Sequence, residues 1–473
     1  MAKRTDSRNS AAKKAKRKLS VNGKSLRDAV SWAVDRQIFA DLKFHGNTKW
    51  QVLDLIVLAI VWVWSDKTQL TAAFLEAHHW SMQVLGRAAV GTYQGLLKAL
   101  VTWTAKLLPL IWERLHQLMQ EHGGEHWRVG HWLALAVDGS RVSVPRTKEN
   151  EKALCAPHYG QSATARFRRR KRKKAGVRSR AKKPEPVKPQ IWITLLWHLG
   201  LQMPWSWVTG PSNSSERNHL RKMLTTQKFP IHTLFCADAG FVGYDLWKAI
   251  IEMGHSFLIR VGANVTLLRK LGYVQERRGI VYFWPGHAAK SQQPPLVLRL
   301  LRLKVGKCTM HLVTNVLDDK QLTIEHAIRL YQLRWGVELQ FRTMKQTFGR
   351  RKLRSKTPDR ALVELDWSLL GLWMIQLFAV KEQIEIGEVP QNCSVSLAIQ
   401  VIRTTFQRLS ERPDQDFWQQ LRSATKDQYK RKASKRARYR PNYKDKPTAG
   451  EPKVRLATQE HKAMLRRHIK NAA

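Results

Sequence analysis

The stretch TLFCADAGFVGYDLWKAIIEMGHSFLIRVGANV (residues 233–265) contains two short apolar runs on either side of an amphipathic segment. The runs TLFCADAG (233–240) and SFLIRVGANV (256–265) stop at Gly, Asp or Asn, as buried strands commonly do. Between them, Tyr244 to Met253 has the spacing of a helix. This order predicts two strands of one sheet joined by a helical crossover.

Three further strand-like runs precede this unit. They are LALAVDGS (133–140), QIWITLLWHLG (190–200) and MPWSWVTG (203–210), and a helix is expected from Asn213 to about Thr225. The first three strands can form an antiparallel meander, and the later strands can join them through crossovers. The sequence therefore predicts a mixed α/β sheet.

The chain around this sheet divides by composition and periodicity. We expect a helical domain at 25–128 before the sheet, which occupies 129–265 and carries a basic loop at 158–189. Residues 266–318 alternate without a helical pattern and predict an all-β insertion. Helices return in a second part of the core at 319–385 and in a C-terminal region at 386–425. A basic arm (1–24) and a basic tail (426–473) flank these regions.

The charge is strongly one-sided. Among 473 residues, 83 Lys and Arg face 36 Asp and Glu, which gives a formal charge of +47. Hydrophobic residues make up 43%, enough for a core, so disorder of the whole chain is excluded. Basic residues gather in 1–24, in 426–445 and in 166–188, which includes Arg168, Arg169 and Arg170. A single basic run is usually a solvated tail, but three on one chain favour contact with phosphate backbones.

Other classes of protein fit less well. The apolar runs Val52–Trp64 and Trp367–Val380 are shorter than the roughly twenty residues of a membrane span and predict buried helices. The N-terminus shows no hydrophobic signal segment, so we expect a cytoplasmic protein without a membrane partner. Four cysteines without a CxxC pair argue against a disulfide framework or a zinc knot. His122 and His126 flank two glycines, which favours a linker over a zinc site.

Two acids follow predicted strands. Asp138 ends the apolar run LALAV, and Asp238 ends LFCA. Asp next to Gly is common in turns, which is the simpler explanation for either aspartate considered alone. Ligands of open α/β sheets nevertheless gather at the carboxyl ends of strands, so the two together indicate a metal site.

A third acid, Glu338, lies in YQLRWGVELQFRTMK (331–345). On a helix of about 100° per residue, the side chains of four polar residues fall within about 60° of one another, beside the apolar face. They are Tyr331, Arg334, Glu338 and Lys345. An i, i+4 ion pair on an amphipathic helix would explain the Arg and Glu without any function.

The spacing Y-x2-R-x3-E-x6-K of these four residues resembles the signature of the IS-four family of DDE transposases. Asp138-Gly139-Ser140 and Cys236-Ala-Asp-Ala-Gly-Phe241 resemble the surroundings of the first two acids in that family. The similarity covers roughly 130–385, and the long Arg-rich loop and the basic C-terminal arm depart from it. It implies an RNase H-like core that is interrupted by a β-rich insertion.

The resemblance implies cut-and-paste DNA transposition, in which Asp138, Asp238 and Glu338 hold two Mg²⁺ ions, with Mn²⁺ as a substitute. It implies that Tyr331, Arg334 and Lys345 contact the DNA backbone. Relatives flip a base onto a Trp while a DNA hairpin forms, which makes Trp284 and Trp335 candidates for stacking.

The expected partners are double-stranded DNA, both as terminal inverted repeats and as target, and a second protomer in a synaptic dimer. The expected location is the cytoplasm, at the nucleoid. Two alternatives stay open: a nucleic-acid-binding protein with a decayed site, and a nuclease of the same sheet class that does not join strands.

Overall fold

In the computed structural model, one mixed sheet runs through the described part of the chain. The described residues are 26–44, 48, 50–155, 175, 188–277, 279–305, 308–408, 417–426 and 450–472. Ten strands follow the order β10-β6-β7-β8-β9-β5-β4-β1-β2-β3. Their bounds are β1 Leu133–Ser143, β2 Gln190–His198, β3 Met203–Pro211, β4 Thr233–Ala237, β5 Ser256–Val261, β6 Thr266–Arg269, β7 Ile280–Phe283, β8 Leu296–Val305, β9 Cys308–Thr314 and β10 Lys453–Leu456.

The half of the sheet from β3 to β5 has the predicted topology. β1 pairs antiparallel with β2, and β2 pairs antiparallel with β3. β4 lies parallel to β1, and β5 lies parallel to β4. The meander and the crossovers are thus confirmed, and the strand order 3-2-1-4-5 is that of an RNase H-like core.

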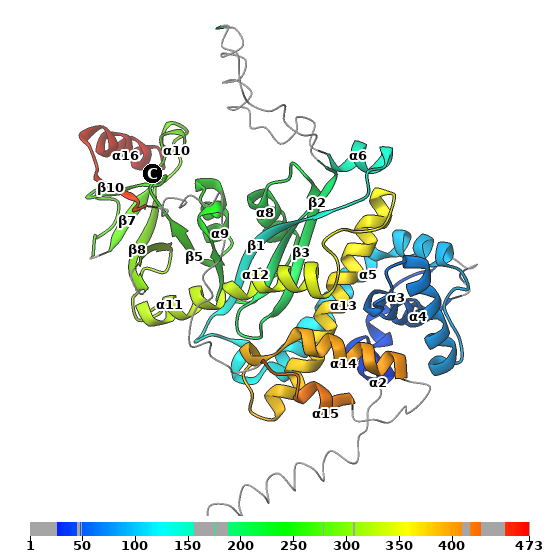
Figure 1. The fold of residues 1–473 in the computed structure, drawn as a ribbon. Coiled ribbons are helices and arrows are strands. Elements are labelled where there is room, and N and C mark those ends of the chain that lie inside the picture. Colours follow the sequence, from blue (N-terminus) through cyan, green and yellow to red (C-terminus); the bar gives the residue numbers. More distant parts are fainter. Residues whose placement is uncertain are drawn as a thin grey trace, which may run out of the picture.

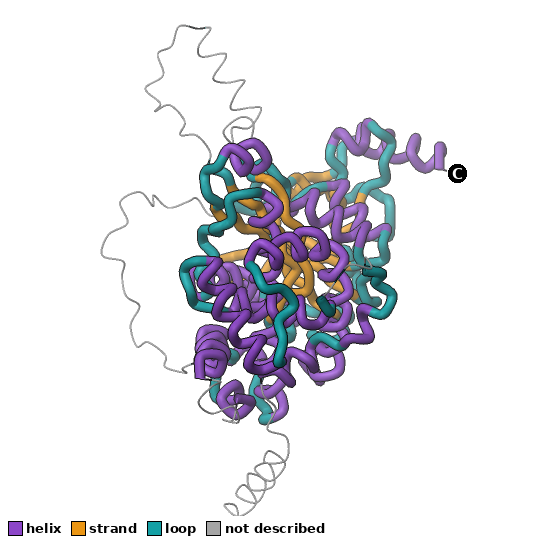
Figure 2. The backbone as a smooth tube through the Cα atoms, turned by 90° about the vertical axis from the view of Figure 1, so that its right-hand side faces the viewer, coloured by secondary structure: helices purple, strands orange, loops and turns teal. Residues whose placement is uncertain are grey.

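Helices cover both faces of this core, which gives three layers (Figures 1 and 2). Helices α8 and α9 lie on one face, whereas α12, α13 and α5 lie on the other. The helix bounds are α2 Leu26–Ala33, α3 Val52–Trp64, α4 Leu70–Leu85, α5 Tyr93–Gly123, α6 Lys148–Leu154, α8 Glu216–Thr226, α9 Tyr244–Glu252, α10 Gly286–Lys290, α11 Ile324–Leu333, α12 Trp335–Arg342, α13 Pro358–Glu385, α14 Val395–Arg408, α15 Phe417–Arg422 and α16 Gln459–Ala472. Short helical turns are η1 Arg36–Phe39, η2 Gly124–Trp127, η3 Ala239–Phe241, η4 Thr343–Thr347 and η5 Pro390–Asn392.

The apolar helix α13 is the centre of the helical side. Helices α3, α5, α14 and α15 all pack against it. Two helical segments, Tyr93–Trp127 and Pro358–Glu385, are long and apolar enough to cross a membrane by length and composition alone. The most apolar window of the second is 94% buried in protein, so its hydrophobicity is explained by packing. α3 coincides with the predicted buried helix Val52–Trp64.

The insertion extends the core sheet instead of forming a separate layer, because β9 pairs antiparallel with β5. It also contains α10, whereas the sequence predicted no helix there. Five residues are too few to show a helical period, which is why the pattern missed this turn.

The last described residues join the same sheet. β10 pairs parallel with β6, and Leu465 of α16 is buried. The sequence had placed these residues in a basic tail, since a four-residue strand next to a basic helix hardly stands out in a basic segment. The N-terminal arm 1–24 lies outside the described residues.

Candidate active site

The first two predicted acids lie side by side on neighbouring strands. The parallel pairing of β1 with β4 ends at Val137 and Ala237, so Asp138 and Asp238 come next on each strand. β1 does not end at Asp138 as predicted but continues to Ser143, because β2 still pairs with it there. Past Val137, β1 has thus lost its neighbour on the β4 side, which opens the sheet at the two acids.

Each aspartate is fixed by a backbone amide. The Asp138 carboxylate accepts from the Gly139 N–H at 2.9 Å, and that of Asp238 accepts from the Gly240 N–H at 2.8 Å. Asp238 is the N-cap of η3. These bonds hold both carboxylates at the opening of the sheet. Each aspartate thus makes a hydrogen bond that is typical of a turn, and the same bond also places it beside the other acid.

The third acid comes from the helical face opposite α8. The predicted helix 331–345 is built from α11, α12 and the π-helical turn η4. Gly336 allows a close approach to the sheet, because a Cβ atom there would lie 2.7 Å from Trp197 Nε1. Buried amides of Gln340 and Gln376 exchange hydrogen bonds of 3.2 and 2.9 Å between α12 and α13. Glu338 is thereby held over β1.

Arg334 is the buried cation of the site. Its side chain is 6% exposed and donates to Glu338 Oε1 at 3.2 Å, whereas Glu338 is 41% exposed. Burial acts to lower the pKa of Arg334, but Tyr331 and the three acids outweigh it, so the net pKa is raised. The i, i+4 pair expected from the sequence exists, yet here it is part of a larger charge cluster.

Within the part of the chain that the structure describes, two buried polar atoms of this cluster lack a hydrogen-bonding partner, Arg334 Nε and Tyr331 Oη. Leaving a buried donor unpaired costs about 1–3 kcal/mol. Burial raises the pKa of Tyr331, so its hydroxyl stays neutral and able to donate. Arg334 Nε and Tyr331 Oη are therefore unpaired donors next to the acids, and they could donate hydrogen bonds to the oxygen atoms of a ligand.

Lys345 reaches the same strand from the π-helical turn. Its Nζ atom donates to Ser140 Oγ at 2.6 Å. Side chains alternate along a strand, so Ser140 and Asp138 face the same side of β1, towards α12. Burial, followed by the charge of Arg351, lowers the pKa of Lys345. The structure therefore brings together all four residues of the predicted stripe and the two aspartates.

The charges of these acids act on one another. Burial raises the pKa of Asp138 to about 6; Arg334 opposes the rise, and Asp238 and Glu338 add to it. Within the described residues, however, no group of three or more His, Cys, Asp or Glu side chains is arranged to hold a metal ion. The carboxylates are neighbours, but Glu338 is engaged by Arg334.

A fourth acid, Glu216, was missed by the sequence analysis. It is the first residue of α8, and its carboxylate lies against Gly139 of β1. Burial, then the charges of Asp138 and Asp238, raises the pKa of Glu216 to about 7. In the sequence it was taken as part of the helix start Asn213-Ser-Ser-Glu, but Ser215 makes no side-chain cap bond. The sequence feature that could have indicated Glu216 is an acid at the first position of the helix that follows the third strand.

The remaining candidates differ in accessibility. Trp335 is 55% exposed, and the Arg334 guanidinium lies 5.2 Å from its ring. Trp284 is 5% exposed, and its indole N–H donates to Gln293 O at 2.8 Å, so it could stack on a base only after moving. Arg168, Arg169 and Arg170 lie outside the described residues.

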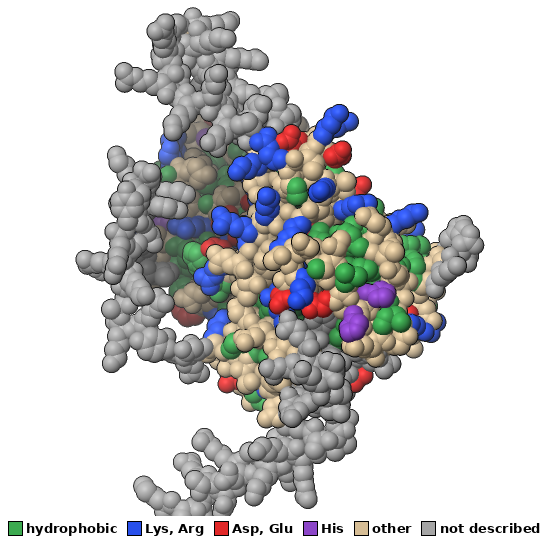
Figure 3. Space-filling model, turned by 45° about the vertical axis from the view of Figure 1, so that its right-hand side comes forward, with side chains coloured by type: hydrophobic (Ala, Val, Ile, Leu, Met, Phe, Trp, Pro, Cys, Tyr) green, Lys and Arg blue, Asp and Glu red, His purple; other side chains and the backbone are tan. Residues whose placement is uncertain are grey.

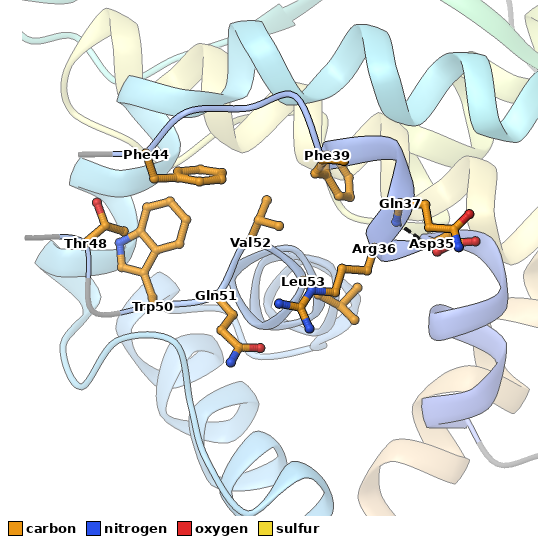
Figure 4. Close-up of a pocket in the computed structure, with 11 residues that line it drawn as sticks. Asp35, Arg36, Gln37, Phe39, Phe44, Thr48, Trp50, Gln51, Val52 and Leu53 are labelled. Carbon is orange, nitrogen blue, oxygen red and sulfur yellow. Dashed lines mark hydrogen bonds between the residues drawn. The ribbon is translucent and has the colours of Figure 1, made fainter. Parts of the chain in front are cut away.

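A cavity of about 750 Å³ lies elsewhere, in the N-terminal helices (Figure 4). Phe39, Phe44 and Trp50 contribute aromatic walls, and none of the acids discussed above lines it. This cavity is therefore separate from the cluster of acids at the opening of the sheet.

Comparison with known proteins identifies the family. Residues 133–374 match the family model "Transposase DDE domain", which covers half of the chain. The chain belongs to the DDE transposase family. The family predicted from the sequence motifs is thus confirmed.

Two individual proteins are similar to this DDE-family chain. The transposase InsG for insertion sequence element IS4 of Escherichia coli (strain K12) is 27% identical over 283 residues, which are 56% of this chain and 57% of that protein. The chain thus matches little more than half the length of this curated relative. A piggyBac transposase synaptic complex with hairpin DNA aligns with a TM-score of 0.39 and 12% identity, over 83% of this chain and 81% of the other.

The DDE family uses divalent metal ions, and the residues of the site fit such an ion. Asp138 and Glu216 have pKa values raised mainly by burial, and neighbouring negative charges add to the effect. A hard cation with oxygen ligands would relieve that repulsion.

Proposed function

We propose that the protein is a DNA transposase that cuts the ends of a mobile element and joins them to target DNA. The observation that supports this best is the meeting of acids from β1, β4 and α12 around the buried Arg334. Family membership and the similarity to an insertion-sequence transposase support the same reaction class.

In this proposal Asp138, Asp238 and Glu338 bind two Mg²⁺ ions, for which Mn²⁺ can substitute. When bound, the ions activate the attacking oxygen and stabilise the leaving oxygen. Arg334, which pairs with Glu338 at 3.2 Å, would supply its guanidinium to a phosphate oxygen. Tyr331 Oη donates to a phosphate oxygen, and Lys345 adds a positive charge beside Ser140.

The proposed partners are double-stranded DNA and a second protomer that holds the other element end. The +47 charge of the chain supports a polyanionic partner. Lys and Arg side chains are spread over the face seen in Figure 3 instead of forming one patch. We propose action in the cytoplasm at the nucleoid, the basic loop 166–188 as a phosphate contact, and Trp335, more than Trp284, as a stacking residue.

The test is metal-dependent cleavage of a supercoiled plasmid that carries the DNA flanking the coding region. Glu338→Gln should lower the cleavage rate about a thousandfold or more, because several kcal/mol of transition-state stabilisation are lost. DNA affinity should be unchanged or higher, because a carboxylate that faces phosphates is removed. Glu325→Gln, a carboxylate in the first turn of α11, is the matched control.

The same assay separates the alternatives. A nuclease without strand transfer would cut the plasmid but would not join a pre-cut 3′ end to a second DNA molecule. A protein with a decayed site would bind DNA without cutting it. Wild-type-like cleavage by Glu338→Gln would remove Glu338 from the reaction.

A further inference from the structure

Glu216 approaches the acids from the face of the sheet opposite to α12. Gly139 lies between Asp138 and Ser140 on β1 and therefore faces the α8 side. An added Cβ atom at Gly139 would lie 2.2 Å from Glu216 Oε1 and 2.5 Å from its Cδ. The carboxylate of Glu216 thus fills the space of the missing side chain, one residue from Asp138.

The glycine at 139 is explained by this contact and not by the backbone. Gly139 has no positive φ, so any residue could adopt its conformation. A glycine within a strand weakens it and often marks the close approach of another group. Because Gly139 has no side chain, there is room for the Glu216 carboxylate beside Asp138, the first acid of the site.

Stabilisation of helix α8 does not account for this position. An acid in the first helical turn contributes about 0.3–1 kcal/mol, and it does so without being buried near other acids. The positive charge of Arg141 acts on Glu216 from the same face of β1, but this guanidinium lies over the Trp192 ring at 4.0 Å. The described surroundings thus leave the charge of Glu216 only partly compensated.

The opening of the sheet lets both faces contribute to one site. β1 loses its β4 neighbour after Val137, so a side chain from α8 and one from α12 can both approach the opening. We propose that Glu216 is a fourth carboxylate of the divalent-cation site and raises its affinity together with the Asp, Asp and Glu triad. This inference rests on the proposed function, because it assumes that the triad binds metal.

The test measures Mn²⁺ binding by the full chain without DNA, from the electron paramagnetic resonance signal of free Mn²⁺. Glu216→Gln should weaken binding about tenfold or more. Gly139→Ala should weaken it similarly, because the methyl group displaces an unaltered Glu216 carboxylate. Asp138→Asn should weaken it further. Glu252→Gln, an exposed acid that pairs with Lys248 on α9, should bind Mn²⁺ like the wild type.

The outcomes separate this inference from the proposed function. If Asp138→Asn weakens binding while Glu216→Gln and Gly139→Ala bind like the wild type, the fourth carboxylate is refuted and the triad stands. If the wild type shows no saturable binding, the metal site itself fails, and the inference fails with it. A second readout is the Mg²⁺ concentration for half-maximal cleavage, which should rise about tenfold in Glu216→Gln.

Discussion

Gly336→Ala should impair cleavage more than it impairs folding. Gly336 lies where α12 meets the turn between β2 and β3, and an added Cβ atom would lie 2.1 Å from Gln202 Oε1 and 2.7 Å from Trp197 Nε1. The Gln202 amide is the end of a flexible side chain and can move aside if it gives up its hydrogen bonds to Leu199 O and Leu333 O. Trp197 is only 3% exposed, so its ring is held by its neighbours and the helix has to shift instead.

The size of the effect follows from these distances. Normal contacts between such atoms begin at about 3.5 Å, so α12 must move by roughly 0.8 Å. Overpacking costs about 1–3 kcal/mol, and alanine returns about 1 kcal/mol of helix propensity, which leaves a net loss of about 0–2 kcal/mol. A displacement near 1 Å of a catalytic group can lower the rate about a hundredfold, equivalent to about 2.7 kcal/mol of activation free energy.

Urea unfolding and plasmid cleavage on the same preparation measure the two effects separately. Gly286→Ala is the matched control, since an added Cβ atom at this position in α10 meets no heavy atom within 4 Å. Full cleavage by a folded Gly336→Ala protein would refute the idea that this contact sets the position of Glu338. A rate loss that only follows the unfolded fraction would refute it as well.

Three other predictions concern pH, packing and salt. Because burial raises the pKa of Asp138 from 3.8 to about 6, the metal-free protein should lose up to about 3 kcal/mol of stability as the pH rises from 4 through 6. Asp138→Asn should therefore unfold at higher urea than the wild type at pH 7.5 but not at pH 4, and equal midpoints at both pH values would contradict this. Gln376→Leu should destabilise the protein by about 1–3 kcal/mol, because it leaves the buried Gln340 amide without its hydrogen-bonding partner. In thermal unfolding, the Gln340→Leu/Gln376→Leu double variant should be more stable than Gln376→Leu alone. Neutralising the basic residues of 166–188 should flatten the salt dependence of DNA binding by about one unit of slope per lost phosphate contact, and an unchanged slope would exclude the loop from the interface.

The sequence was most informative where one residue pattern had one physical meaning. Short apolar runs stopped by Gly or Asp predicted strands β1 to β5, and the three-dimensional pairing agrees. Helical periodicity placed Arg334, Glu338 and Lys345 on one stripe, and the structure brings that stripe over β1. The prediction of the site residues thus relied on local periodicity and on the order of the predicted strands.

The sequence was less informative where tertiary contacts decide. A helix-opening acid such as Glu216 is common, and only the approach to Gly139 makes it unusual. The burial of Trp284 and the pairing of β10 with β6 depend on segments distant in the chain. The continuation of β1 beyond Asp138 likewise depends on β2, because a Gly-Ser pair alone predicts a turn.

The continuity of the sheet fixes a distance. Four inter-strand steps separate β4, which ends beside Asp238, from β7 in the insertion, or about 19 Å at the usual strand spacing. Because these strands are hydrogen-bonded without a break, the insertion cannot swing on a hinge relative to the acids. Any ligand bound by β7 would therefore lie at a fixed distance from Asp238.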